Sequence, residues 1–212
     1  MLRAWLSTLL LTTSFVLACN VNAQPDDFKS ITFGESDTKY SFRNQGDRLI
    51  IDALGQDSAS GLFILNPDMC LHQGRLSWSW RVEQIQPTAD ITMEDKEDFA
   101  AALIVLFGKP GLFTKPKGLI YGFTNTDLPP GSVVNSPRAP DNFRTIVLGN
   151  KNSPLMSWLQ HERNIIEDYK LAYGETPNKP LHTIGVFTDN DQTIEPVEAS
   201  YDLQSCELST KD

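Results

Sequence analysis

The side chains best suited to bind an ion or a ligand lie in an acidic loop that follows a predicted strand. Asp189 and Asp191 stand two positions apart in the segment Asp-Asn-Asp-Gln-Thr. Ca²⁺ takes about six to eight oxygen ligands, and acidic loops of this kind supply several of them. The loop is not an EF-hand, because its sixth position is Ile194 rather than glycine and its twelfth is Ser200 rather than glutamate. Either Asp189 and Asp191 form a calcium site, or the Asp and Asn side chains hydrogen-bond their own turn; the second interpretation is favoured.

A second acidic segment and two arginines extend this set of candidates. Asp98 closes the acidic cluster at residues 94–98, which would complete a site with the loop only if the fold brings the two together. Arg81 follows Trp80 on a strand predicted to be central, and Arg163 follows a glutamate further along the chain. A buried guanidinium needs a carboxylate partner. The available partners are Asp98, Glu162, Asp189 and Asp202. These groups either line an anionic or sugar-binding cleft or form internal salt bridges that pin a helix to a sheet, and the second interpretation is favoured.

The remaining motifs for ligand binding or catalysis are absent or ambiguous in this sequence. Trp78 and Trp80 share one face of a strand, where they could stack on sugar rings, but among aliphatic neighbours a core position is favoured. The three histidines show no zinc-ligand spacing, and there is no G-x-S-x-G motif or phosphate-binding glycine loop. A pair of carboxylates acting on a glycosidic bond stays open, because such pairs are defined by their separation in space.

Composition narrows the class of partner. The 212 residues include 27 acidic and 18 basic side chains, for a formal net charge of −9. A chain this acidic has no general electrostatic attraction to nucleic acid or to an anionic membrane surface. We therefore expect no nucleic acid partner, and no segment is long and apolar enough to predict a transmembrane helix.

The N-terminal 23 residues are typical of a secretory signal. Arg3 precedes an apolar stretch, and small residues before residue 24 predict cleavage after Ala23. The expected mature chain is a single domain at residues 24–212 in the periplasm or secreted. Alternatively, the segment ending at Cys19 resembles a bacterial lipobox, which would give an outer-membrane lipoprotein. Cleavage after Ala23 leaves Cys70 and Cys206, and an oxidising compartment favours a disulfide between them over two unpaired thiols.

The elements expected to position these residues are mostly strands. Period-two alternation or short apolar runs predict strands at residues 47–53, 60–65, 74–84, 99–107, 117–124, 143–148, 181–188 and 197–207. One substantial helix is predicted at about residues 154–173, with Ser153 as its N-cap and Gly174 after its end. The predicted fold is all-β dominated: an antiparallel, jelly-roll-like β-sandwich with this helix laid against an edge or face.

Several linked motifs carry a family resemblance. They are the segments at residues 58–62, 76–82, 98–101, 162–164, 168–169, 173–177, 185–193 and 201–202. In this order and spacing the chain resembles the bacterial family called domain of unknown function 3047. Glu97 stands where the family typically has aspartate, and Asn190 and Gln192 stand where it more often has threonine and asparagine. The resemblance implies a secreted or periplasmic β-rich domain and implies no activity.

The function favoured by these observations is binding without catalysis. We expect a β-sandwich that binds a carbohydrate or an envelope polysaccharide, with calcium as the one candidate ion. A glycan-acting enzyme with a carboxylate pair and a structural envelope protein without a small ligand are the alternatives. The candidate ligand-binding residues are Trp80, Arg81, Asp98, Arg163, Asp189 and Asp191.

Overall fold

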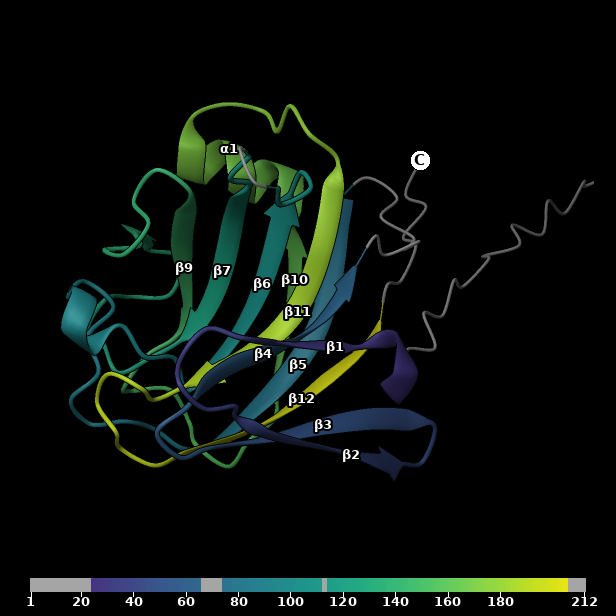
Figure 1. Cartoon of the computed structure of the whole chain (residues 1–212), viewed down its shortest axis with the longest axis vertical. Helices are drawn as coiled ribbons and strands as arrows, with labels where there is room; N and C mark the ends of the chain where they lie inside the picture. Colours follow the sequence, from purple (N-terminus) through teal and green to yellow (C-terminus); the bar gives the residue numbers. More distant parts are fainter. Residues whose placement is uncertain (1–23, 66–73, 112–113, 206–212) are drawn as a thin grey trace, which may run out of the picture.

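The computed structural model describes residues 24–65, 74–111 and 114–205 (Figure 1). The strands of one sheet are β1 (Lys29–Thr32), β4 (Ala59–Leu65), β6 (Ala101–Phe107), β7 (Lys117–Phe123), β8 (Val133–Asn135), β9 (Phe143–Gly149) and β11 (Leu181–Asp189). Those of the other are β2 (Lys39–Gln45), β3 (Arg48–Gly55), β5 (Arg75–Gln84), β10 (Leu159–Asn164) and β12 (Val197–Ser205). One α-helix, α1 (Ile165–Tyr173), and two 3₁₀ turns, η1 (Pro25–Asp27) and η3 (Glu94–Lys96), complete the described elements. The expected signal, Cys19, Cys70 and Cys206 lie outside the described residues.

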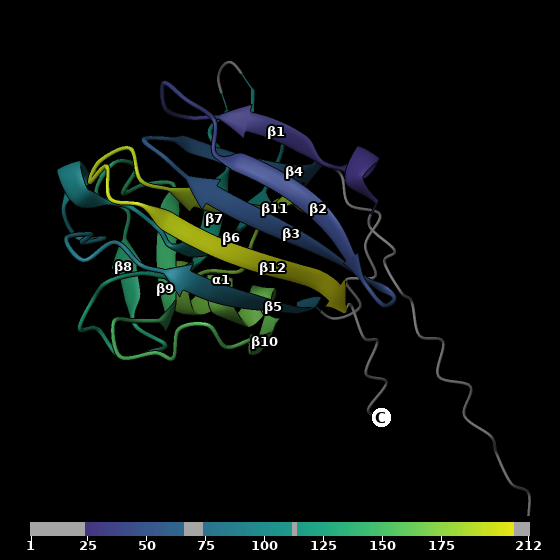
Figure 2. The ribbon, with the colours of Figure 1, turned by 90° about the horizontal axis from the view of Figure 1, so that it is seen from below.

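The two sheets lie face to face as a β-sandwich (Figures 1 and 2). The seven-stranded sheet has the order β1-β4-β11-β6-β7-β9-β8, and the five-stranded sheet has the order β10-β5-β12-β3-β2. All pairs are antiparallel except β7 and β9, which run parallel. The predicted all-β sandwich with one helix is therefore confirmed. Among the described residues, no helix is long and apolar enough to cross a membrane.

The main core fills the space between the two sheets. Alternation along β5 turns Trp78 and Trp80 inward, where they are 1% and 0% exposed. Trp78 packs on Tyr121 of β7 in the facing sheet, with ring centroids 5.1 Å apart. The burial of both side chains confirms the interpretation that the two tryptophans belong to the core. Large aromatic side chains of this kind supply much of the area that a two-layer fold must bury.

The helix is shorter than predicted. Its N-cap is Asn164, whose side chain accepts hydrogen bonds from the backbone N–H groups of Ile166 and Glu167, and Gly174 ends it at φ 72°. The predicted start near residue 154 is wrong, because residues 159–164 form β10 and pair with β5. This strand satisfies backbone groups that β5 would otherwise leave unpaired at the sheet edge. α1 covers one end of the sandwich (Figure 1), where Tyr169 packs edge-on against Phe107.

A second apolar cluster lies on the outer face of the seven-stranded sheet. Phe63 of β4, Ile104 of β6 and Phe187 of β11 all belong to it. Phe99 and Ile91, from the segment between β5 and β6, pack over part of this face. A sheet in a sandwich usually presents its outer face to water with polar side chains. This face departs from that rule, and the groove described next lies on it.

Candidate ligand-binding groove

The outer face of the seven-stranded sheet carries an open groove with a cavity volume of about 460 Å³. This volume lies within the range of about 300–1,000 Å³ that is typical of small-molecule sites. Its apolar lining comes from β1, β4, β6, β7, β9, β11 and adjoining loops. These residues are Ile31, Phe33, Ala59, Phe63, Leu65, Phe99, Ile104, Leu106, Pro110, Ile120, Ala139, Phe143 and Phe187.

Glycines form part of the floor of the groove. A Cβ atom on Gly185 would lie 2.3 Å from Cδ1 of Phe63, and one on Gly61 would lie 2.5 Å from Cε2 of the same ring. The Phe63 ring therefore occupies the space that two side chains would otherwise fill. Aromatic rings laid over strand glycines in this way restore packing that glycine alone cannot provide. The result is a smooth apolar floor rather than a polar sheet surface.

Phe33 is the exposed wall of the groove. It follows β1 and is 61% exposed, although its ring packs edge-on against Phe63 and Phe187 at centroid distances of 6.0 and 5.7 Å. Its backbone N–H donates to the carbonyl oxygen of Ala59 at 2.8 Å, which fixes its position beside β4. An aromatic ring held by two others yet largely open to water is available to contact a ligand.

The carboxylates that line the groove gather where β11 ends, and the fully buried Asp98 lies next to them. Asp98, Asp189 and Asp191 each bring a carboxylate oxygen within 4.8 Å of the other two. Asp98 bridges from the segment after η3 to the loop after β11, accepting from the backbone N–H and the hydroxyl of Thr193 at 2.8 and 2.6 Å. Asp189 accepts from the backbone N–H of Phe99 at 2.7 Å. The fold thus brings together the two acidic segments that the sequence left apart.

Burial governs the electrostatics of this end. It raises the pKa of Asp189 well above the usual range, and the nearby charge of Asp98 raises it further. Burial also raises the pKa of Asp98, although the hydrogen bonds from Thr193 oppose the rise. Glu97 has a pKa raised by burial, against the opposing effect of Ser136 and Arg138. Carboxyls this close and this buried favour retention of a proton within the group.

A polar compartment of about 660 Å³ adjoins the acidic end. It is lined by Phe33, Gly34, Glu35, Asp57, Asp95, Arg138, Asp191 and Gln192. Phe33, Arg138, Asp191 and Gln192 line the apolar groove as well. The groove and the compartment therefore meet and form one continuous site, which is apolar in the groove and polar in the compartment.

The other candidate site residues lie elsewhere. Trp80 is in the core between the sheets, with no exposed surface. Arg81 is on the outer face of the five-stranded sheet and pairs with Glu83 at 3.1 Å, a partner that was not among those expected. None of these contacts reaches the groove.

Arg163 belongs to a network at the helix. Its Nε donates to Asp168 of α1 at 2.8 Å, and the hydroxyl of Tyr121 donates to the same carboxylate at 2.7 Å. The network joins β10, α1 and β7. Asp168 was not among the expected partners of Arg163. The network still joins α1 to the sheets, in agreement with the interpretation that arginine–carboxylate pairs pin the helix there.

Calcium stays a prediction. With one oxygen from each, the three aspartates offer three ligands, fewer than the about six to eight oxygens that Ca²⁺ takes. Asp98 already accepts three hydrogen bonds from Gln192 and Thr193. The raised pKa of Asp189 means that its carboxyl favours the protonated form, and a protonated carboxyl would have to lose its proton before it could bind Ca²⁺.

Sequence reasoning missed the phenylalanines of the groove: Phe33, Phe63, Phe99, Phe143 and Phe187. A signal was present, because β4 and β11 carry apolar residues on both faces, with Gly61 beside Phe63 and Gly185 beside Phe187. In a two-layer fold, a strand that is apolar on both faces indicates that something covers the outer one.

The family follows from the sequence match. A family model described as Protein of unknown function (DUF3047) matches residues 26–203. The chain belongs to this family. The resemblance noted in the sequence is thereby confirmed over nearly all the described residues. No curated protein matches the sequence.

Solved structures with a similar fold include proteins that act on or bind carbohydrate. A family 11 carbohydrate-binding module of a Clostridium thermocellum cellulase is 8% identical, with 91% of this chain and 94% of that chain covered and a TM-score of 0.47. A cellulase derived from Cel12A of Rhodothermus marinus is 11% identical, with 89% and 94% covered and a TM-score of 0.49. The xyloglucanase domain of NopAA from Sinorhizobium fredii is 12% identical, with 91% and 98% covered and a TM-score of 0.44. These likenesses concern the arrangement of strands alone.

Proposed function

We propose that the protein is a binding protein whose groove holds the apolar body of a ligand without converting it. The observation that carries this proposal is the groove itself: an open cavity of about 460 Å³ lined by aromatic and aliphatic side chains on the outer face of a sheet. An apolar surface left in water costs free energy, and large exposed patches of this kind mark binding sites. With cleavage after Ala23, the proposed location is the periplasm.

An apolar chain fits the lining better than a polysaccharide does. Each methylene group buried contributes about 0.8 kcal/mol. A polysaccharide carries hydroxyls on every ring, and each hydroxyl buried without a partner costs about 1–3 kcal/mol. The middle of the groove, around Phe63, Ile104 and Ile120, offers aromatic and aliphatic side chains, whereas the carboxylates gather at one end.

Carbohydrate or envelope polysaccharide is the second candidate. Phe33 favours it, because an exposed ring beside Asp191 and Gln192 gives a sugar one stacking surface with polar partners next to it. This arrangement would hold one or two rings at the acidic end and leave the rest of the groove unused.

Hydrolysis of a glycan has weaker support. Asp98 and Asp189 are 0% and 4% exposed, whereas both carboxyls of a glycosidase pair flank the scissile bond of the substrate. Asp98 is also held by hydrogen bonds to the loop after β11. A purely structural role leaves the apolar groove without an explanation.

The test is a fluorescence titration with N-phenyl-1-naphthylamine, an uncharged apolar probe. We expect saturable binding that 1-octanol displaces and that a panel of soluble polysaccharides does not. Phe33→Ala should weaken binding severalfold. Leu171→Ala is the matched control, because Leu171 on α1 is also 61% exposed and lies outside the groove. Displacement by a polysaccharide but not by octanol would favour the second candidate, and equal effects of the two variants would contradict the site.

A further inference from the structure

The adjoining polar compartment identifies the other half of the ligand. Building on the proposed function, we propose that the ligand is a single-chain amphiphile whose head is an uncharged polyol, such as a sugar, with the apolar chain in the groove and the head in the compartment. Two cavities of different chemistry meet at Phe33, Asp191 and Gln192. A ligand that fills both must be apolar along one part and polar at the other.

The charges of the compartment exclude an anionic head. Four carboxylates, those of Glu35, Asp57, Asp95 and Asp191, face one guanidinium, that of Arg138. Glu97, which lines the groove, lies with its Oε2 3.9 Å from the Nε of Arg138 and so already pairs with this guanidinium. A phosphate, sulfate or carboxylate head would meet like charges on most sides, which is costly at close range.

Free acceptors are present for a head that donates hydrogen bonds. The side chains of Glu35, Asp57, Asp95 and Asp191 form no hydrogen bond or ion pair with other described residues. Carboxylates accept from hydroxyls in short, charge-assisted hydrogen bonds. A polyol supplies several such donors from one small group.

Donors in the same compartment favour a polyol over an ammonium head. The Nε of Arg138 donates to the carbonyl oxygen of Glu94 at 3.2 Å, while its two Nη groups make no hydrogen bond with other described residues. Gln192 lines both cavities and adds a side-chain amide. Hydroxyls can accept from these groups as well as donate to the carboxylates, whereas an ammonium can only donate.

The experiment compares compounds that share an octyl chain and differ in their head group. Binding is measured by isothermal titration calorimetry, with each amphiphile below its critical micelle concentration. The probes are octyl β-glucoside, 1-octanol, octylammonium and octyl sulfate, with glucose alone as a fifth. We expect octyl glucoside to bind about tenfold tighter than 1-octanol and tighter still than octyl sulfate or glucose. Asp57→Asn, which changes a residue that lines the compartment and not the groove, should reduce the advantage of octyl glucoside while leaving 1-octanol unchanged. Glu167→Gln, on α1 away from both cavities, changes the same charge and should have no effect.

The outcomes separate the two proposals. If 1-octanol and octyl glucoside bind equally, with both weakened by Phe33→Ala, the groove is supported and the polyol head is overturned. Tighter binding of octylammonium than of octyl glucoside would also overturn the polyol, in favour of a cation. If no octyl compound binds, both the groove and the head proposals fail. Binding of glucose as tight as that of octyl glucoside would contradict the apolar chain.

Discussion

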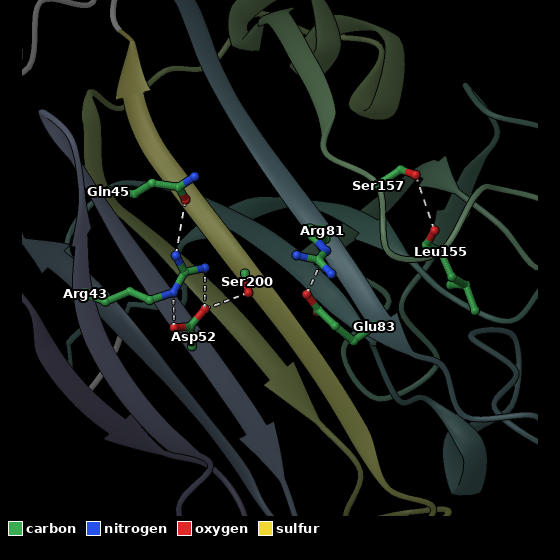
Figure 3. A network of polar contacts seen from close by, with 8 residues as sticks. All are labelled: Arg43, Gln45, Asp52, Arg81, Glu83, Leu155, Ser157 and Ser200. Atoms are coloured by element: carbon green, nitrogen blue, oxygen red, sulfur yellow. Dashed lines mark hydrogen bonds and ion pairs between the residues drawn. The ribbon is translucent and has the colours of Figure 1, made fainter.

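The outer faces of the two sheets differ in chemistry although they belong to one sandwich. On the five-stranded sheet, Arg43 pairs with Asp52 at 2.6 Å, Ser200 donates to the same carboxylate at 2.6 Å, and Arg81 pairs with Glu83 (Figure 3). These side chains pair with one another, and those of Arg43 and Asp52 are 43% and 33% exposed. Such a face needs no cover, which is the ordinary state of a sandwich in water.

The outer face of the seven-stranded sheet follows the opposite rule. Phe63 and Phe99 are each 2% exposed and belong to an apolar cluster separate from the main core. The loop that carries Ile91 and Phe99 covers part of this face, and the groove is a part that stays open. The difference supports the proposed apolar ligand, because a face meant only for solvent would resemble the first.

The largest expected effect comes from removing the floor of the groove. Phe63→Ala should lower the free energy of unfolding by about 3–5 kcal/mol, because it deletes a buried ring that nothing nearby can replace. Phe33→Ala on the same face should cost much less, since Phe33 is 61% exposed. Urea denaturation of both variants checks this. A loss below about 1 kcal/mol for Phe63→Ala would show that the outer cluster is not packed as a core.

Filling the space beneath that ring should cost less. Gly61→Ala would place a Cβ 2.5 Å from Cε2 of Phe63 and 2.9 Å from the carbonyl oxygen of Val186, so we expect a loss of about 1–3 kcal/mol. In a double-mutant cycle with Phe63→Ala, most of this penalty should disappear, because the ring that causes it is gone. Additive losses would contradict the stacking of Phe63 on the glycine floor.

The acidic end should make stability fall with rising pH. Burial raises the pKa of Asp189 in the folded state, so the folded protein holds this proton above the pKa of the unfolded chain. Its stabilising contribution is complete below about pH 4 and is lost as the pH rises through the folded pKa, by about 1.4 kcal/mol for each unit between the two values.

The control for this pH dependence is Asp189→Asn, which keeps an acceptor for the N–H of Phe99 but cannot ionise. Its melting temperature should fall less between pH 4 and 8 than that of the unchanged protein. His161 acts in the other direction, since burial lowers its pKa to about 4 and its contribution is lost as the pH falls from about 6.5, but both proteins carry it. Identical profiles between pH 4 and 8 would contradict a raised pKa for Asp189.

The smallest effect is expected on the polar face. Arg43 and Asp52 have side chains 43% and 33% exposed, so their pairing energy should be about 0.2–1 kcal/mol. A double-mutant cycle with Arg43→Ala and Asp52→Ala measures it directly. If the pairing energy of Arg43 and Asp52 were as large as the loss of unfolding free energy caused by Phe63→Ala, the two outer faces would not differ in their contribution to stability.

Much of the fold could be predicted from the sequence, because local patterns determine it. Alternation along residues 75–84 is enough to place Trp78 and Trp80 inside the sandwich. The start of the helix could not be predicted in the same way. Residues 159–164 read as helix by spacing, but their pairing with β5 is a tertiary contact that local periodicity does not contain.

The site was only partly predictable for the same reason. Asp98 and Asp189 could be chosen by residue type, yet their meeting depends on the pairing of β11 with β6 and on the segment that places Phe99 beside Asp189. No sequence motif marks Phe33 as a site residue. Its position in the groove depends on edge-on contacts with Phe63 and Phe187, which are distant from it in the sequence. Long-range pairing, rather than motif, assembles the groove.

The most direct test of the central claim is a methyl NMR titration of isoleucine-labelled protein with 1-octanol. Ile31, Ile104 and Ile120 line the groove, whereas Ile50 and Ile51 lie on β3 of the other sheet, so one sample contains both the site and its control. We predict saturable shifts of the three groove methyls with little change at the β3 pair. Shifts at Ile50 and Ile51 instead, or none at any isoleucine, would contradict an apolar binding site on the seven-stranded sheet.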